Sequence, residues 1–334
     1  MAVYKIFSEK DAFISSYRST QNFGRDEILE ISNETNTTSV NADVTRTLLQ
    51  FPTSQINNVV NNIIGSNSYS SSLRLFLAEA TLPVDYIIYA YPLSQSWDMG
   101  LGKSADNPTT TTGVTWTSSP SYSLDYSGSQ TFLYSDNKDI NMDVTSIVTQ
   151  WETGSIDNSG LILKLSSSIE NSTTPLITKF FSMDTHTIYP PQLEFRWDDS
   201  SYSTLLPQIS DSTFLSTITN NKSSFKESTT YTFRIKSRSI YPPRAFQTTS
   251  TYLGTKALPS TAYWALKDVK TEEMVVDFDT TFTKISCDNT SNYFKLYMDG
   301  LEPERYYQIL YKVVLSNGET VIIDNKSNYF KVVR

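Results

Sequence analysis

The chain has 334 residues, enough for two domains with sizeable cores, and combines 38% hydrophobic content with 21 Tyr, 17 Phe and only 11 Gly. Charged residues make up 19%, below the usual share of about 25%, so we expect a surface made largely of hydroxyl and amide groups. The net charge of −8, without runs of Lys or Arg, argues against a nucleic-acid partner. The single cysteine, Cys287, excludes an intrachain disulfide and a Cys-based zinc cluster.

The N-terminal segment, residues 1–7, lacks the long apolar stretch of a signal peptide, and no window of the chain approaches 18 apolar residues. We therefore expect a chain that is made soluble in the cytoplasm and has no membrane partner.

The segment 10–31 sets the pattern for the first half of the chain. Two apolar runs, Ala12–Ile14 and Ile28–Ile31, flank a polar span that contains Asn22 and Gly24, which predicts a strand, a long turn and a strand. Further strands are predicted in the first half over residues 45–51, 71–80, 86–91, 160–165, 178–183 and 191–197.

Two short helices interrupt these strands. Apolar residues at helical spacing predict one over Ser54–Ile64 and another that starts after Asp143, taken as its N-cap, and extends to Trp151. Residues 34–43 form a predicted polar excursion, and Gly100–Gly113 a Thr- and Asn-rich loop. The aperiodic residues 198–202 predict a domain border between 1–199 and 200–334.

Short motifs in the first half occur in a characteristic order. They are Asp11-Ala12, Asn22-Phe23-Gly24, Ile28–Ile31, Arg46–Phe51, Leu73–Leu77, Ser96-Trp97, Val114–Pro120, Asp143–Thr145 and Pro191–Leu193. This arrangement, over about residues 5–197, resembles DNRLRE-type β-sandwich domains, which are related to jelly-roll carbohydrate-binding modules. The resemblance implies a jelly-roll-like sandwich. Some related domains hold a structural calcium, for which Asp11, Asn22 and Asp26 are candidate ligands; the alternative is that these side chains only satisfy their own turns.

The second half also has strands at short spacing, predicted over 225–235, 263–268, 273–278, 293–298, 308–315, 319–324 and 328–332. Asn317-Gly318 is a hairpin signal. The motif Gly300-Leu301-Glu302-Pro303, followed by Tyr306 and Tyr307, resembles the corner of immunoglobulin-like and fibronectin-like domains, in which one of the two tyrosines would tether the turn. The expected fold is all-β, with two antiparallel β-sandwich domains, jelly-roll-like and then Ig-like, and one or two short helices.

The sequence offers few residues that could carry out catalysis. His186 is the only histidine, and it lies in a predicted turn, which excludes a two-histidine metal site. A glycosidase pair among Asp98, Glu194, Asp198, Asp199, Asp277 and Asp279 is less favoured than turn and surface roles. Trp97, Trp116, Trp151, Trp197 and Trp264 are interpreted mainly as core residues, with sugar stacking as the alternative. We expect no enzyme, no cofactor and no bound metal beyond the calcium candidates.

The preferred functional interpretation is a structural protein of a bacteriophage virion, because the second half also resembles tailed-phage virion proteins. Such a protein would lie in the neck, tail or baseplate periphery or decorate the capsid. It would form a homo-oligomer in a symmetric assembly and would bind other virion proteins. The N-terminal strand, with Val3, Tyr4, Ile6 and Phe7, is the candidate attachment element. The alternative is a carbohydrate-binding adhesion module that recognises a host glycan in a cleft rimmed by the loop Gly100–Gly113.

Overall fold

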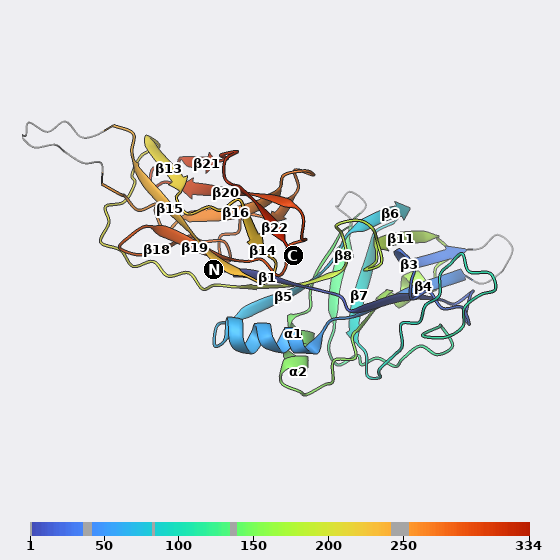
Figure 1. Ribbon diagram of the computed structural model, residues 1–334. Helices are drawn as coiled ribbons and strands as arrows, with labels where there is room; N and C mark the ends of the chain where they lie inside the picture. Colours follow the sequence, from blue (N-terminus) through green and yellow to red (C-terminus); the bar gives the residue numbers. More distant parts are fainter. Residues whose placement is uncertain (1, 36–41, 82–83, 134–138, 242–253) are drawn as a thin grey trace, which may run out of the picture. The chain divides into compact units, whose positions relative to one another are not determined.

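The computed structural model describes residues 2–35, 42–81, 84–133, 139–241 and 254–334. It confirms the all-β prediction: antiparallel sheets form a sandwich-like architecture with a few short helices (Figure 1). The chain divides into two compact units. The N-terminal unit comprises Lys5–Ser66 and Ser70–Phe195; the C-terminal unit comprises Met1–Tyr4, Asn67–Tyr69 and Arg196–Arg334.

The first twelve strands form two sheets. The four-stranded sheet has the order β1 (Ala2–Phe7), β12 (Gln192–Trp197), β5 (Tyr69–Leu75) and β9 (Ile140–Asp143). The eight-stranded sheet has the order β6 (Leu77–Thr81), β11 (Leu176–Phe181), β3 (Ile28–Thr35), β4 (Ala42–Gln50), β10 (Leu161–Leu165), β7 (Tyr86–Pro92) and β8 (Gly128–Phe132), and β2 (Lys10–Ser15) also pairs with β4.

Strand β7 shows how the sequence pattern produces the sheet. Tyr86, Ile88 and Ala90 are buried, whereas the residues between them are only half-buried, as expected for side chains that alternate between two faces. Its partner β10 is buried at every position, because it lies between β4 and β7 and both of its faces are covered.

The helices are short and differ in detail from their predictions. The first predicted helix is present as α1 (Thr53–Asn58), which continues into the wider turns of η1 (Val59–Ile64). The second is α2 (Thr145–Glu152), and a one-turn helix, α3 (Ser167–Glu170), was not predicted. Asp143 is not the N-cap of α2, which is Val144; Asp143 still accepts a hydrogen bond from the backbone N–H of Thr145 at 2.8 Å.

The single strand predicted over 71–80 is wrong. The chain leaves the four-stranded sheet after Leu75 and enters the eight-stranded sheet at Leu77, so the apolar run is divided between β5 and β6. The residues of β5 and of β6 both favour strands, but the two strands pair in different sheets. The Leu77 backbone N–H donates to the Asp139 carboxylate at 2.8 Å where the second strand begins.

The C-terminal unit contains two further sheets. One has the order β13 (Phe214–Ile218), β15 (Thr230–Ser239), β19 (Asn292–Tyr297) and β18 (Ser286–Cys287). The other has the order β14 (Ser224–Lys226), β22 (Tyr329–Val333), β20 (Tyr306–Val314), β16 (Ala262–Asp268) and β17 (Met274–Val276), with β21 (Thr320–Ile323) paired to β20. The pairing of β14 with β22 is parallel, an exception to the antiparallel prediction.

Aromatic side chains dominate the core of this unit. Phe233 packs against Phe225, Phe294 and Phe330, and the rings of Trp264 and Phe294 stack with centroids 5.1 Å apart. Such ring pairs add to the stabilisation that comes from burying their apolar area.

Two local predictions for the C-terminal unit are confirmed. The Tyr307 hydroxyl donates to the Glu302 carbonyl at 3.0 Å and tethers the corner before β20, whereas Tyr306 points to solvent. Gly318, with a φ of 87°, completes the hairpin between β20 and β21.

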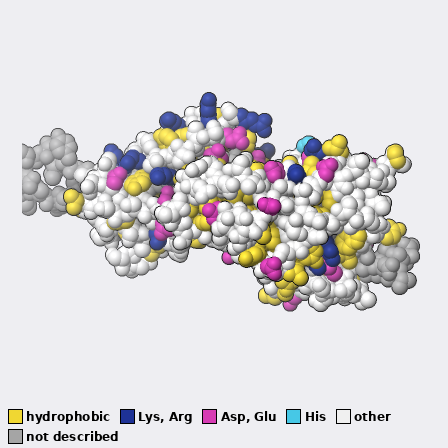
Figure 2. Space-filling view, turned by 90° about the horizontal axis from the view of Figure 1, so that it is seen from below, with side chains coloured by type: hydrophobic (Ala, Val, Ile, Leu, Met, Phe, Trp, Pro, Cys, Tyr) yellow, Lys and Arg dark blue, Asp and Glu magenta, His cyan; other side chains and the backbone are white. Residues whose placement is uncertain are grey.

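The surface also follows the composition. On the face shown in Figure 2, uncharged polar side chains and backbone predominate, and charges of both signs are scattered among apolar patches. None of the helices in the described ranges is long and apolar enough to span a membrane. Most of the excursion predicted over 34–43 and the prolines at 242 and 243 lie outside the described residues.

Candidate functional site

Asn22, one of the calcium candidates, holds the long loop that follows β7. Its amide nitrogen donates to the carbonyls of Met99 at 2.9 Å and Val114 at 2.8 Å, and its amide oxygen accepts from the backbone N–H groups of Gly102 at 2.8 Å and Gly24 at 3.2 Å. A side-chain amide has two donors and two lone pairs, so all its positions are used within the protein. Asn22 therefore anchors the loop through its side-chain amide, and its role as a calcium ligand stays a prediction.

Asp11 and Asp26 both contact the turn that follows β11, where the Asp26 carbonyl accepts from the Ser182 hydroxyl at 2.6 Å. The Asp11 carboxylate accepts from the Met183 backbone N–H at 2.6 Å, and burial raises its pKa to about 7. Asp26 accepts from the Ser104 backbone N–H at 2.7 Å, and burial also raises its pKa. Within the described ranges, no group of three or more His, Cys, Asp or Glu side chains could hold a metal ion. A calcium site at Asp11 and Asp26 stays a prediction.

The candidate attachment strand is used inside this chain. β1 pairs with β12, and Val3, Tyr4 and Ile6 are buried, with Phe7 half-buried. These side chains therefore pack the chain's own cores. Because β1 is the end strand of its sheet, addition to a neighbouring sheet stays a prediction.

The residues weighed for catalysis have structural roles. His186 is exposed in a turn, and Cys287 is buried on β18. Glu194 is buried 3.6 Å from Lys5, Asp198 lies 3.6 Å from Lys284, and the carboxylates of Asp98, Asp277 and Asp279 accept from backbone N–H groups in turns. Trp97, Trp151, Trp197 and Trp264 are buried, which confirms the core interpretation for these four; Trp116 is half-buried.

The loop 100–113 does rim a hollow. A cavity of about 460 Å³ is lined by Leu101, Lys103 and Asp106 of this loop and by Arg25, Glu27, Asp184 and His186. The Arg25 guanidinium pairs with the Asp184 carboxylate at 2.8 Å across it. The cleft predicted for the carbohydrate-binding alternative therefore has a counterpart, lined by charged side chains of both signs, by Leu101 and by His186, with no Phe, Tyr or Trp among these lining residues.

A second candidate surface lies on the half-buried face of β7. Tyr89 and Tyr91 are two residues apart and share this face, with ring centroids 5.9 Å apart, and Tyr122 of the loop continues the row with its centroid 5.4 Å from that of Tyr91. The ring planes differ by 15° and 29°. We call these three side chains the tyrosine row. All three rings are half-buried, and in the described part of the chain none of their hydroxyls has a hydrogen-bond partner.

A charged cluster adjoins the tyrosine row. Lys164 is the cross-strand partner of Tyr89, and its ammonium lies 3.0 Å from the Glu170 carboxylate. Arg46 donates two hydrogen bonds to Glu170, at 3.0 and 2.9 Å, and its guanidinium lies 4.8 Å from the centre of the Trp116 ring. Two cations share one carboxylate, so the cluster keeps a net positive charge and unused N–H donors.

Loop packing decides which part of this face stays accessible. Residues of the loop cover the sheet around Leu48 and Ile162 in a separate apolar cluster with Leu93, Trp97 and Val114. Tyr91, Trp116 and Tyr122 border that cluster and are only partly buried. The tyrosine row and the charged cluster therefore lie at the margin of the covered area.

Sequence reasoning did not single out these residues. The alternation Tyr89-Ala90-Tyr91 is a signal that both rings share one face, and Lys164 interrupts the apolar run Leu161–Leu165. Nothing in the sequence links them to Tyr122, Arg46 or Glu170, which other segments bring to the same face.

Comparisons with known proteins show what this chain is similar to. No curated protein matches the chain. Among solved structures, the chain is similar to the adhesin domain of Epf from Streptococcus pyogenes, with 8% identity, a TM-score of 0.21 and coverage of 100% of this chain and 98% of that one. It is also similar to two structures of a Parabacteroides merdae beta-glucuronidase, with 11% and 12% identity, TM-scores of 0.21 and 0.19, and coverage of 99% and 96% of this chain but only 36% of each of theirs.

TM-scores of this size carry no argument about function. The family match is specific: the model of carbohydrate-binding module family 96 matches residues 2–195, which are more than half of the chain and contain the tyrosine row and the loop-rimmed hollow. The chain belongs to carbohydrate-binding module family 96.

Proposed function

We propose that this protein is a non-catalytic adhesion module that binds a surface glycan along the tyrosine row. The observation that carries this proposal is the row itself: three half-buried, nearly parallel rings whose hydroxyls are unpaired among the described residues, next to an anchored pair of cations. The family match supports carbohydrate as the class of ligand. It also reverses the order of the two interpretations of the sequence, because it favours the binding module over the virion protein.

The chemistry of the row suits a sugar chain. A pyranose ring has apolar C–H groups that pack against aromatic carbon, and hydroxyls that need hydrogen-bond partners. Tyrosine offers both an apolar ring and a polar tip, and it loses little conformational freedom on binding. Arg46 is held by Glu170 and needs little reorganisation to donate to sugar hydroxyls, whereas Lys164 is buried and contributes only its positive charge.

The test uses the full chain on a glycan array, followed by calorimetry with the best ligand. Tyr91→Ala removes the central ring and Tyr122→Ala an end ring, and each is expected to weaken binding at least about tenfold. Tyr17→Ala is the matched control, because Tyr17 is exposed and lies outside the row, and its affinity should stay within about twofold.

The loop-rimmed hollow is the competing location within the same unit. Leu101→Ser and Lys103→Gln change two of its lining side chains, of which Leu101 is strongly exposed, and leave the row intact. If these variants lose affinity while Tyr91→Ala and Tyr122→Ala do not, the site lies in the hollow. If no glycan binds the native chain, the proposed function fails.

The virion interpretation stays a prediction, as do the location in a virion, the homo-oligomer and the virion partners. Mass analysis of purified particles and light scattering of the isolated chain test it. Abundance in particles at a copy number that fits a symmetric assembly would support it, and a monomer that is absent from particles would contradict it.

A further inference from the structure

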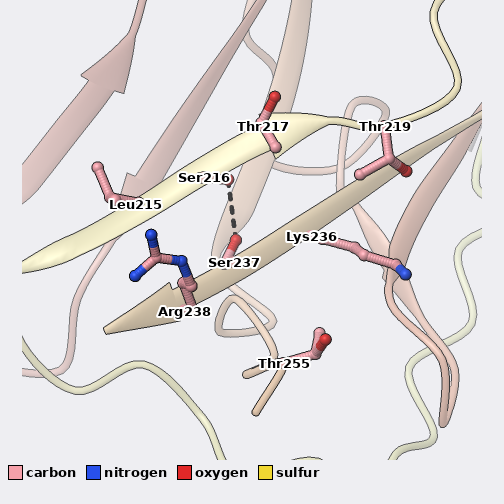
Figure 3. A pocket seen from close by; sticks show the side chains of 8 residues that line it. All are labelled: Leu215, Ser216, Thr217, Thr219, Lys236, Ser237, Arg238 and Thr255. Carbon is pink, nitrogen blue, oxygen red and sulfur yellow. Dashed lines mark hydrogen bonds between the residues drawn. The ribbon is translucent and has the colours of Figure 1, made fainter. Parts of the chain in front are cut away.

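A separate cleft, with a cavity of about 450 Å³, opens beside β13 and β15 of the C-terminal unit. Leu215 and Thr217 of β13, Lys236 and Arg238 of β15, and Thr255 contribute to its lining (Figure 3). None of its lining residues is acidic. This volume suits a small ligand rather than a single water molecule.

Strand register places the two cations on one face. Leu215 pairs with Arg238 and Thr217 with Lys236, so these four side chains project from the same side of the two strands. Between them, the hydroxyls of Ser216 and Ser237 are hydrogen-bonded at 2.8 Å and join the strands. In Figure 3 the Arg238 guanidinium and the Lys236 ammonium lie on either side of this bonded pair. The cleft is therefore built on paired strands and carries a cation at each side.

These cations are not neutralised by the protein. In the described part of the chain neither Lys236 nor Arg238 forms an ion pair, and Arg238 donates one hydrogen bond, to the Ser239 carbonyl at 3.1 Å. By contrast, Arg234, the preceding cation on the same strand, pairs with the Asp288 carboxylate at 2.9 Å. Two cations on one face of a strand without a neutralising carboxylate among the described residues are unexpected in a chain with a net charge of −8.

We propose that this cleft binds an oxyanion, namely a carboxylate, sulfate or phosphate group of a small molecule. Arg238 retains N–H donors in the fork geometry that matches two oxygens of such a group, and Lys236 adds a second positive charge. The hydroxyls of Thr217 and Thr255, which have no hydrogen-bond partner in the described ranges, are available to the rest of the ligand. This site is independent of the glycan surface of the N-terminal unit.

The experiment is an NMR titration of the isotopically labelled full chain with sodium sulfate, sodium phosphate and sodium gluconate, at ionic strength held constant with sodium chloride. Sorbitol is the neutral counterpart of gluconate. We expect saturable shifts of backbone amides in β13 and β15 with at least one of the three anions and none with sorbitol. Saturation with gluconate alone identifies a hydroxylated carboxylate, whereas saturation with sulfate or phosphate identifies an inorganic type of oxyanion.

Variants decide whether the cleft is the site. Arg238→Gln and Lys236→Gln should each weaken binding about tenfold or more, and Arg238→Lys should have a smaller effect because it keeps the charge but loses the fork. Lys326→Gln, an exposed residue outside the cleft, is the matched control for charge removal. Equal affinity in Lys236→Gln and in the native chain, shifts that do not saturate, or equal shifts with sorbitol would overturn the proposal. If Arg238→Gln does not fold, Lys236→Gln alone tests whether the cleft is the site, because replacing an exposed side chain should leave the fold intact.

Discussion

The amide oxygen of Asn22 accepts a hydrogen bond from the Gly102 backbone N–H at 2.8 Å, although 80 residues separate the two in the sequence. A Cβ atom at Gly102 would lie 2.3 Å from the Asn22 carbonyl oxygen, so only glycine allows this approach. The contact links the turn after β2 to the loop that carries part of the candidate glycan-binding surface.

Asn22→Ala should destabilise the N-terminal unit by about 3 to 5 kcal/mol, because four backbone groups of buried or half-buried loops lose their partner together. Urea unfolding of the full chain measures the change. Asn62→Ala is the control, since exposed Asn62 makes one side-chain hydrogen bond within the described ranges, to Asn58, and should change stability by less than about 0.5 kcal/mol. Equal effects of the two variants would contradict the anchor role.

Asp11 predicts a pH dependence of stability. Burial raises its pKa from 3.8 to about 7, so the folded chain keeps this proton between about pH 4 and pH 7 while the unfolded chain loses it. The contribution of Asp11 to the free energy of unfolding therefore falls as the pH rises across this window, by up to about 4 kcal/mol, and is constant above it.

Asp11→Asn should flatten that part of the stability profile, measured by urea unfolding at a series of pH values. Asp157→Asn, an exposed control, should keep the native profile. Arg25 and Asp184 also act on Asp11, the first lowering and the second raising its pKa. A profile of Asp11→Asn that still falls between pH 4 and pH 7 by the native amount would contradict the assignment.

Arg46→Lys should weaken glycan binding severalfold and lower stability by about 1 to 2 kcal/mol, because lysine cannot make both hydrogen bonds to Glu170 or cover the Trp116 ring. Calorimetry and thermal unfolding measure the two effects. Arg25→Lys is the stability control: its ion pair with Asp184 is 43% exposed on the arginine side, and it should cost less than about 0.5 kcal/mol. Unchanged glycan affinity in Arg46→Lys would remove the charged cluster from the binding surface.

Tyr307→Phe should destabilise the C-terminal unit by about 1 to 2 kcal/mol, because the Glu302 carbonyl loses its hydrogen bond in a buried corner. Tyr306→Phe is the paired control, since Tyr306 is 49% exposed and does not hold the corner. Urea unfolding followed by near-ultraviolet circular dichroism distinguishes the two variants. If the control is affected equally, the tether does not stabilise the corner.

The strands could be predicted because their signal is local. The alternation in β7 and the mainly apolar run of β10 reflect the exposure of each position on a pleated sheet, which any strand of that pattern shares. The hairpin at Gly318 and the corner at Tyr307 are also local, because their partners lie within a few residues. The sequence by itself therefore determined the all-β class and many of the turns.

The local sequence pattern does not show which strand or loop each segment contacts in the folded chain. The run 71–80 reads as one strand, but β5 and β6 belong to different sheets, and no residue in the run marks the change. Asn22 was recognised as part of a motif, but its role as an anchor depends on Gly102 and Val114, which approach it only after folding. A hydrogen bond between distant segments leaves no periodicity in either of them.

The candidate surface was decided by tertiary structure for the same reason. Tyr89 and Tyr91 share a face through strand geometry, but Tyr122 reaches them from the loop, and Arg46, Lys164 and Glu170 come from three separate elements. In the C-terminal unit, register alone places Arg238 and Lys236 on the face of Leu215 and Thr217. The amino-acid composition and the spacing of apolar residues determined the all-β class. The pairing of distant strands and loops decided which side chains meet, because that pairing depends on packing across the whole fold.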